Sequence, residues 1–193
     1  MLQDRILVFD ESGQGFDAPG NIGTGKRYFA QLTVDAPLGR VWSGLRVKAN
    51  GMVQRTRVED PISGKMRNFS GFYASWEWFT EVRRDVGAFS YGFAISDRDR
   101  FTFFRTDEFD INYNGGPYGT AFVEYRPGPR TAITFDVDNA LNTSSNRERL
   151  LFFPNRADTE LSIREVRERN RHLSFGLTLK QSFGGAAGVA KTN

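Results

Sequence analysis

The stretch from His172 to Phe183 constrains the fold more than any other part of the sequence, because its side chains alternate between apolar and polar. One face of the predicted strand carries large apolar side chains: Leu173, Phe175, Leu177, Leu179 and Phe183. The other face carries small or polar side chains: His172, Ser174, Gly176, Thr178, Lys180 and Ser182. Side chains alternate across a strand with period 2, so the pattern predicts a β-strand with one apolar face. Such a strand fits either a barrel wall between lipid and lumen or a soluble β-sandwich.

The same alternation recurs along the chain and predicts about eight strands. The other candidate strands are 6–9, 28–34, 45–54, 72–83, 89–96, 121–125 and 131–138. Turn-like segments at 37–40, 84–87 and 126–130 alternate with long polar segments at 10–26, 59–70, 97–116 and 139–160. We therefore expect an all-β antiparallel outer-membrane barrel segment, with short periplasmic turns at one end and long extracellular loops at the other.

Composition excludes several classes of protein. No run approaches the roughly 20 apolar residues of a membrane-spanning helix. The chain has no cysteine and one histidine, so neither a thiolate metal site nor a zinc site is expected, and no cofactor is predicted. The 26 basic residues are nearly matched by 23 acidic ones, so nucleic acid is not an expected partner. No secretory signal pattern opens the sequence, which for an outer-membrane protein suggests a mature form or a fragment.

Two segments carry a resemblance to a known family. The stretch 135–142, Phe-Asp-Val-Asp-Asn-Ala-Leu-Asn, and the closing strand through Phe183 resemble the carboxy-terminal part of the barrel of TonB-dependent receptors. Weaker similarities lie at 18–23 and 58–64. The resemblance implies a large outer-membrane barrel with an amino-terminal plug. Such receptors import scarce, bulky nutrients such as ferric siderophores, cobalamin or oligosaccharides, driven by the inner-membrane TonB complex.

The resemblance also implies a division of the chain and a set of partners. Residues 1–183 would be barrel strands without the plug and without about 14 of the roughly 22 strands of such a barrel. Residues 184–193 continue past the terminal aromatic and are expected to be disordered. The expected partners are outer-membrane lipid, the assembly machinery that recognises the strand ending at Phe183, an unknown small-molecule ligand and, through the missing plug, the TonB complex.

Two groups of side chains are predicted to meet different surroundings in such a barrel. The lumen or plug would face polar side chains of the strands: Arg46, Lys48, Asn50, Glu77, Asp136 and Asp138. The membrane interfaces would hold aromatic girdles: Tyr73, Trp76, Trp78, Phe79, Tyr91 and Tyr125. The mixed-charge runs 146–149 and 164–171 are interpreted as an extracellular extension of the last hairpin, because Leu161 and Ile163 keep the parity of the closing strand.

Three possible chemical motifs have simpler interpretations. Residues 20–26 match the GxxxxGK part of a phosphate-binding loop, but Arg27 replaces the magnesium-binding Ser or Thr and a strand pattern follows. Asp107, Glu108 and Asp110 lack the spacing of a calcium loop and are interpreted as a solvated loop. His172 has no partner for catalysis and is expected at the lumen or rim. No catalytic residue is predicted, so we do not expect an enzyme.

Two alternatives to a receptor segment in the bacterial outer membrane stay open. The chain would also fit a self-sufficient small outer-membrane barrel with a structural or adhesive role. A soluble β-sandwich that acts as a binding module would use the same alternation.

Overall fold

A computed structural model describes residues 2–157 and 160–183, and every regular element in them is a β-strand. The strands are β1 (Gln3–Phe9), β2 (Gly15–Asn21), β3 (Lys26–Pro37), β4 (Leu45–Glu59), β5 (Met66–Arg67), β6 (Trp76–Val86), β7 (Phe89–Arg98), β8 (Phe101–Phe104), β9 (Glu108–Asn114), β10 (Tyr118–Gly128), β11 (Thr131–Asp138), β12 (Ser144–Phe152), β13 (Leu161–Asn170) and β14 (Ser174–Gln181). The prediction of an all-β antiparallel protein is confirmed.

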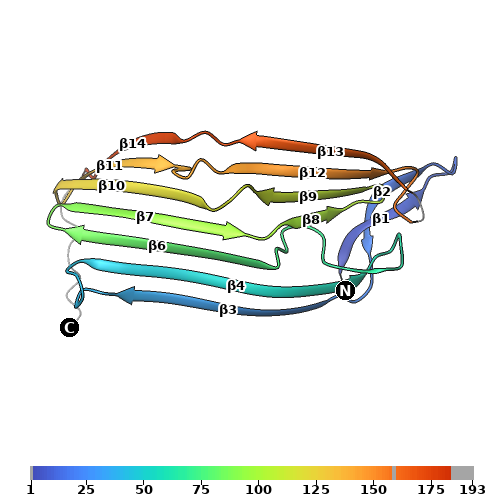
Figure 1. The fold of residues 1–193 in the computed structure, drawn as a ribbon, viewed down its shortest axis with the longest axis horizontal. Coiled ribbons are helices and arrows are strands. Elements are labelled where there is room, and N and C mark those ends of the chain that lie inside the picture. The colour runs from blue at the N-terminus through green and yellow to red at the C-terminus, as the bar shows by residue number, and fades with distance from the viewer. Residues whose placement is uncertain (1, 158–159, 184–193) are drawn as a thin grey trace.

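The main sheet has eight antiparallel strands in the order β14-β11-β10-β7-β6-β4-β3, with the short β5 paired to the far end of β4. Seven strands therefore make up the main path, and each is hydrogen-bonded to its neighbours along it. Figure 1 shows β14 and β3 at opposite edges of one open layer. Within the described residues the two edge strands do not pair with each other, so the sheet is not a closed barrel.

A second sheet continues the first along the strand direction. It has four strands in the order β13-β12-β9-β8. In Figure 1, β8 follows β7 along one line, and the same holds for β9 with β10, β11 with β12, and β13 with β14. Most strands are thus longer than the sequence predicted, and the hairpin of β12 and β13 confirms the predicted extension of the last hairpin.

The short connections gather at one end of the main sheet, as the sequence predicted. They join β3 to β4, β6 to β7, and β10 to β11, on the left in Figure 1. Gly44 in the first of them has φ of +74°, and a Cβ atom there would lie 1.8 Å from the backbone oxygen of Asp85. Only glycine therefore fits this contact without a shift of the backbone. We call this end of the molecule the tight-turn end and the opposite end the loop end.

The prediction that every connection at the loop end is long is wrong. Segment 97–116 is mostly the hairpin of β8 and β9, segment 139–160 contains β12, and segment 10–26 contains β2. β9 does alternate, with Phe109 and Ile111 opposite Glu108 and Asp110, but its segment was interpreted as a loop because of its charges. In β12 both faces are polar or mixed, as in the run Arg147-Glu148-Arg149. The strand predicted from Phe72 begins only at Trp76. The residues before it belong to a loop, in which Ala74 is buried.

The hydrophobic core is small and lies at the loop end. Ile22, Val58 and Phe69 form its buried cluster, and Leu2, Ile6 and Tyr73 pack against them. The hairpin of β1 and β2 and the connection between β4 and β6 thus cover one face of β4 beyond the main sheet. The described strands form no second layer over the main sheet, so the main sheet has no sandwich core (Figure 1).

Residues 184–193, with the predicted disordered tail, lie outside the described residues. In the described part, no helix is long and apolar enough to span a bilayer.

Candidate functional site

One face of the main sheet, which we call the apolar face, carries apolar side chains on all seven strands of the path. The pairing register aligns a complete row of them across the sheet: Ala36, Val47, Val82, Phe93, Ala121, Val137 and Phe175. Directly opposed residues in a sheet point to the same side, so alternate residues on each strand extend the row into a continuous surface. Among the described residues no second sheet covers it, although the side chain of Leu141 lies over Gly119 of β10, and Leu177 on this face is 77% exposed.

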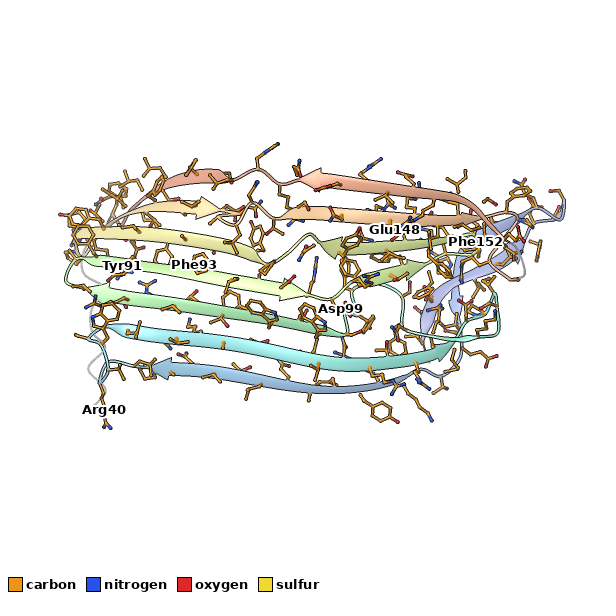
Figure 2. All side chains as sticks on the ribbon, in the orientation of Figure 1. Arg40, Tyr91, Phe93, Asp99, Glu148 and Phe152 are labelled. Carbon is orange, nitrogen blue, oxygen red and sulfur yellow. The ribbon has the colours of Figure 1, made fainter. Side chains whose placement is uncertain are left out.

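Aromatic side chains lie at both ends of the apolar face. At the tight-turn end, Phe89 and Tyr125 stack with their ring centroids 4.8 Å apart. Beside them, Nη1 of Arg84 donates a 3.0 Å hydrogen bond to the hydroxyl of Tyr91, and its guanidinium lies 4.0 Å from the Trp42 ring centroid. Figure 2 shows Tyr91 and Phe93 on β7 toward this end.

At the loop end of the apolar face stand Trp76 and Trp78, which oppose Val53 and Gly51 of β4. Two of the predicted girdle residues are elsewhere. Phe79 has the opposite parity and points to the other side of the sheet, and Tyr73 packs edge-on against Phe69 at 5.2 Å. The alternating pattern was extended back to Phe72, but β6 begins only at Trp76, so it does not give the orientation of Tyr73.

The opposite surface of the main sheet, the polar face, contains all six side chains predicted to face a lumen. Arg46 and Asp136 belong to one row that crosses the sheet through Phe122, and Asn50, Lys48 and Glu77 share its parity. Arg46 forms hydrogen bonds with Asp35, with Nε 2.6 Å from Oδ1. Nδ2 of Asn50 donates to Oγ1 of Thr33 at 2.8 Å. The hydroxyl of Tyr118 donates to Asp138.

A cleft of about 330 Å³ opens on the polar face where the two sheets meet. Its lining combines charged, amide and aromatic side chains: Asn50, Glu77, Trp78, Phe79, Ser96, Arg98, Asn114, Tyr118 and Arg171. Only Asn50 and Glu77 were predicted. Arg98 and Asn114 were missed because they fell in a segment interpreted as a loop. The cleft therefore offers positively charged, negatively charged and neutral hydrogen-bonding groups to a polar ligand.

The second sheet carries a ladder of ion pairs. Asp110 receives two hydrogen bonds of 2.7 Å from Nε and Nη2 of Arg147. Glu108 receives hydrogen bonds of 2.7 and 2.8 Å from Arg149, whose Nη1 also donates to Glu165 at 3.0 Å. The interpretation of Glu108 and Asp110 as a solvated loop is therefore wrong, because both are buried strand residues whose charges are paired.

The ladder shifts the pKa of its members. Burial favours the neutral form of Asp110, but the hydrogen bonds and charge of Arg147 outweigh burial and lower the Asp110 pKa. The hydrogen bonds that Arg149 donates to Glu108 act in the opposite sense and raise the pKa of Arg149. The lowered pKa of Asp110 and the raised pKa of Arg147 and of Arg149 keep these three groups ionised at neutral pH, so they act as fixed charges.

A buried charge network joins three segments at the loop end. Asp60 accepts hydrogen bonds from Nη1 of Arg156 at 2.8 Å and from Nε of Arg67 at 2.9 Å. Nη2 of Arg67 in turn donates to Asp4 of β1 at 2.9 Å. The guanidinium of Arg156 also lies 4.7 Å from the ring centroid of Phe109. The network fastens the amino-terminal hairpin to the β4–β6 and β12–β13 connections.

The remaining predicted residues lie near the edge strand β14. Phe175, Leu177 and Leu179 are on the apolar face, opposite Val137, Phe135 and Ile133. Leu173 precedes the strand and Phe183 follows it, and both are exposed. His172 lies in the break between β13 and β14 and is exposed. Residues 20–26 join β2 to β3 with no helix after them, so they lack the strand–loop–helix context of a phosphate-binding loop.

The comparisons with known proteins provide no further assignment. No family model, no curated protein and no solved structure matches this chain.

Proposed function

We propose that this chain forms barrel strands of a TonB-dependent-type receptor in the bacterial outer membrane, which imports a scarce, bulky nutrient. The observation that carries the proposal is the apolar face, an uncovered apolar surface on every strand of the main path. On β6 it spans the whole 11-residue strand between Trp76 and Val86. A strand that crosses a bilayer at a tilt needs about 9–11 residues, so the height of the face fits the hydrocarbon layer.

The exposure of this face argues against a soluble β-sandwich. Large apolar patches on soluble monomers rarely exceed a few hundred Å² and are usually covered by a partner. Here the apolar side chains have no second sheet to pack on, and those near the edges, such as Leu32 and Leu177, are the most exposed. In a bilayer, acyl chains would cover this surface, so its apolar side chains would not be exposed to water.

The unpaired edges of β3 and β14 favour a large barrel over a small one. A self-sufficient small barrel would pair its first and last strands, whereas these lie on opposite sides of the open sheet (Figure 1). Additional strands between the two edges would close the wall and satisfy their backbone groups. The polar face would then line the lumen, where its cleft and charged side chains meet the ligand or the plug that couples to TonB.

The proposal is tested by an immunoblot of outer-membrane fractions from cells that express the protein at its natural level. We expect the antiserum against this chain to detect a band several times the 21.9 kDa of this sequence. A band near 21.9 kDa in the outer membrane would overturn the receptor and leave a small barrel. A band confined to the soluble fraction would overturn the membrane assignment itself.

A further inference from the structure

Three basic side chains stand on the apolar face just beyond its apolar stretch at the loop end. Lys26 of β3 lies directly opposite Arg57 of β4, and Tyr28 lies opposite Arg55. These residues, with Thr24 and Met66, line a cleft of about 440 Å³. We call Lys26, Arg55 and Arg57 the basic cluster.

The basic cluster has no counter-charge in the described residues. All three side chains are exposed, and none forms an ion pair or a side-chain hydrogen bond there. Glu59, two residues beyond Arg57 on the same strand, pairs with none of them. Like charges directly opposite each other destabilise a sheet, so the pair Lys26 and Arg57 favours an external anion.

An apolar groove extends from the basic cluster along the same face. It has a volume of about 490 Å³, and its apolar lining includes Ala30, Leu32, Gly51, Val53, Trp76 and Trp78. Gly51 forms the floor, because a Cβ atom there would meet nothing within 4 Å. A third hollow of about 380 Å³ shares Tyr28 and Arg55 with the cleft around the basic cluster, and Ala30 and Val53 with the groove. The three hollows are therefore continuous.

We propose that this surface of β3 and β4 binds a membrane lipid with a phosphate headgroup, which rests on Lys26, Arg55 and Arg57 while an acyl chain lies in the groove over Gly51. The inference rests on the proposed function, since it requires the apolar face to meet lipid. Charge complementarity and the order of the two parts select this occupant. On both strands the basic side chains lie at the end of the apolar stretch. A lipid has the same arrangement, with its charged headgroup at the end of its acyl chains at the bilayer surface.

The test uses tryptophan fluorescence of the protein in phosphatidylcholine vesicles that contain phosphatidylglycerol. Bromine atoms on an acyl chain quench a nearby indole, and the label is placed on either lipid in turn. A Trp42→Phe background leaves Trp76 and Trp78 as the only reporters. We expect labelled phosphatidylglycerol to quench more strongly than labelled phosphatidylcholine at equal mole fraction.

Two variants test the two parts of the site. The triple variant Lys26→Gln, Arg55→Gln, Arg57→Gln should reduce the preference for phosphatidylglycerol at least about tenfold, since one basic group at an anionic surface contributes roughly fivefold in affinity. In Gly51→Val, the new side chain would occupy the groove without a clash, because nothing lies within 4 Å of a Cβ atom there. It should therefore displace the acyl chain and reduce quenching by the labelled phosphatidylglycerol. The control triple variant Arg40→Gln, Arg130→Gln, Lys180→Gln removes the same charge at the tight-turn end and should keep the preference.

The other outcomes separate this inference from the proposed function. Equal quenching by both labelled lipids would overturn the lipid site and leave the membrane face standing. No quenching by either would overturn the proposed function together with the site. Loss of the preference on addition of inorganic phosphate would show a site for the free anion and overturn the lipid as its occupant.

Discussion

Asp60 and Arg156 lie 96 positions apart in the sequence, and two hydrogen bonds of 2.8 and 3.3 Å join their side chains at the loop end. Their side chains are only 2% and 3% exposed. Removal of one partner from a buried ion pair costs about 3–5 kcal/mol when the other charge is left without compensation. Arg67 still pairs with Asp60 at 2.9 Å after such a change, so we expect Arg156→Gln to destabilise the loop end by less than this full amount, measured by hydrogen exchange of Ile22 and Val58. Arg169→Gln, at an exposed unpaired position of β13, is the matched control, and equal effects would contradict the role of the network.

The same network predicts a dependence of stability on pH. Burial opposes ionisation of Asp60, but hydrogen bonds from Arg156 and the backbone of Ile62, with the charge of Arg67, lower the Asp60 pKa below its ordinary value of 3.8. The contribution to stability is therefore complete above pH 3.8 and is lost as the pH falls through the lower folded-state pKa. Asp60→Asn should remove this part of the acid destabilisation, in unfolding curves recorded across that range. An unchanged acid slope in the variant would disprove it.

The two faces of β14 predict opposite responses to the same substitution. Leu177→Arg introduces a charge on the apolar face and should cost about 2–4 kcal/mol of folding free energy in a bilayer if the position lies near the midplane. Thr178→Arg places the same charge on the polar face and should be mild. Urea-induced unfolding in vesicles measures both, and similar losses at the two positions would refute the assignment of the faces.

The pair Glu108–Arg149 should be coupled more strongly than the pair Asp35–Arg46. The first has side chains 6% and 29% exposed, whereas those of the second are 43% and 51% exposed. Exposed pairs usually contribute at most about 1 kcal/mol, and partly buried bidentate pairs contribute more. Double-mutant cycles with Gln and Asn replacements measure both couplings. A coupling for Glu108–Arg149 no larger than that for Asp35–Arg46 would speak against a structural role of the ladder.

Gly44 should tolerate no side chain. Its φ of +74° disfavours other residues by roughly 1–2 kcal/mol, and a Cβ atom would also contact the backbone oxygen of Asp85 at 1.8 Å. We expect Gly44→Ala to cost more than about 2 kcal/mol in equilibrium unfolding. Gly39→Ala, in the same turn but with nothing within 4 Å of the new methyl group, should change little.

The alternation of apolar and polar residues predicted the main sheet well because one face of it is uniformly apolar. The runs at 45–54, 89–96 and 131–138 became β4, β7 and β11, and their parity placed Arg46 and Asp136 on the same face. The pattern also located the tight turns, and Gly87 in one of them has a positive φ, whereas Gly44 lies just beyond the turn predicted at 37–40. The resemblance to TonB-dependent receptors stays a prediction.

Pattern reasoning failed where acidic residues suggested a solvated loop. Glu108 and Asp110 were interpreted as loop residues, yet their pairing with Arg147 and Arg149 across β9 and β12 stabilises the second sheet. The network of Asp60 and Arg156 joins segments whose proximity depends on the whole topology. The basic cluster was equally hidden, because only the register of β3 against β4 places Lys26 opposite Arg57.

Along the main sheet the strands follow one another in chain order, with the hairpin of β8 and β9 between β7 and β10, and that of β12 and β13 between β11 and β14. Neighbours in the sheet such as Thr131 and Gln181 are therefore far apart in the sequence, and yet no connection needs to cross another. In the proposed larger barrel, the free backbone amides and carbonyls of β3 and β14 each need a neighbouring strand from outside the described sheet, so the two edges are satisfied by different partners.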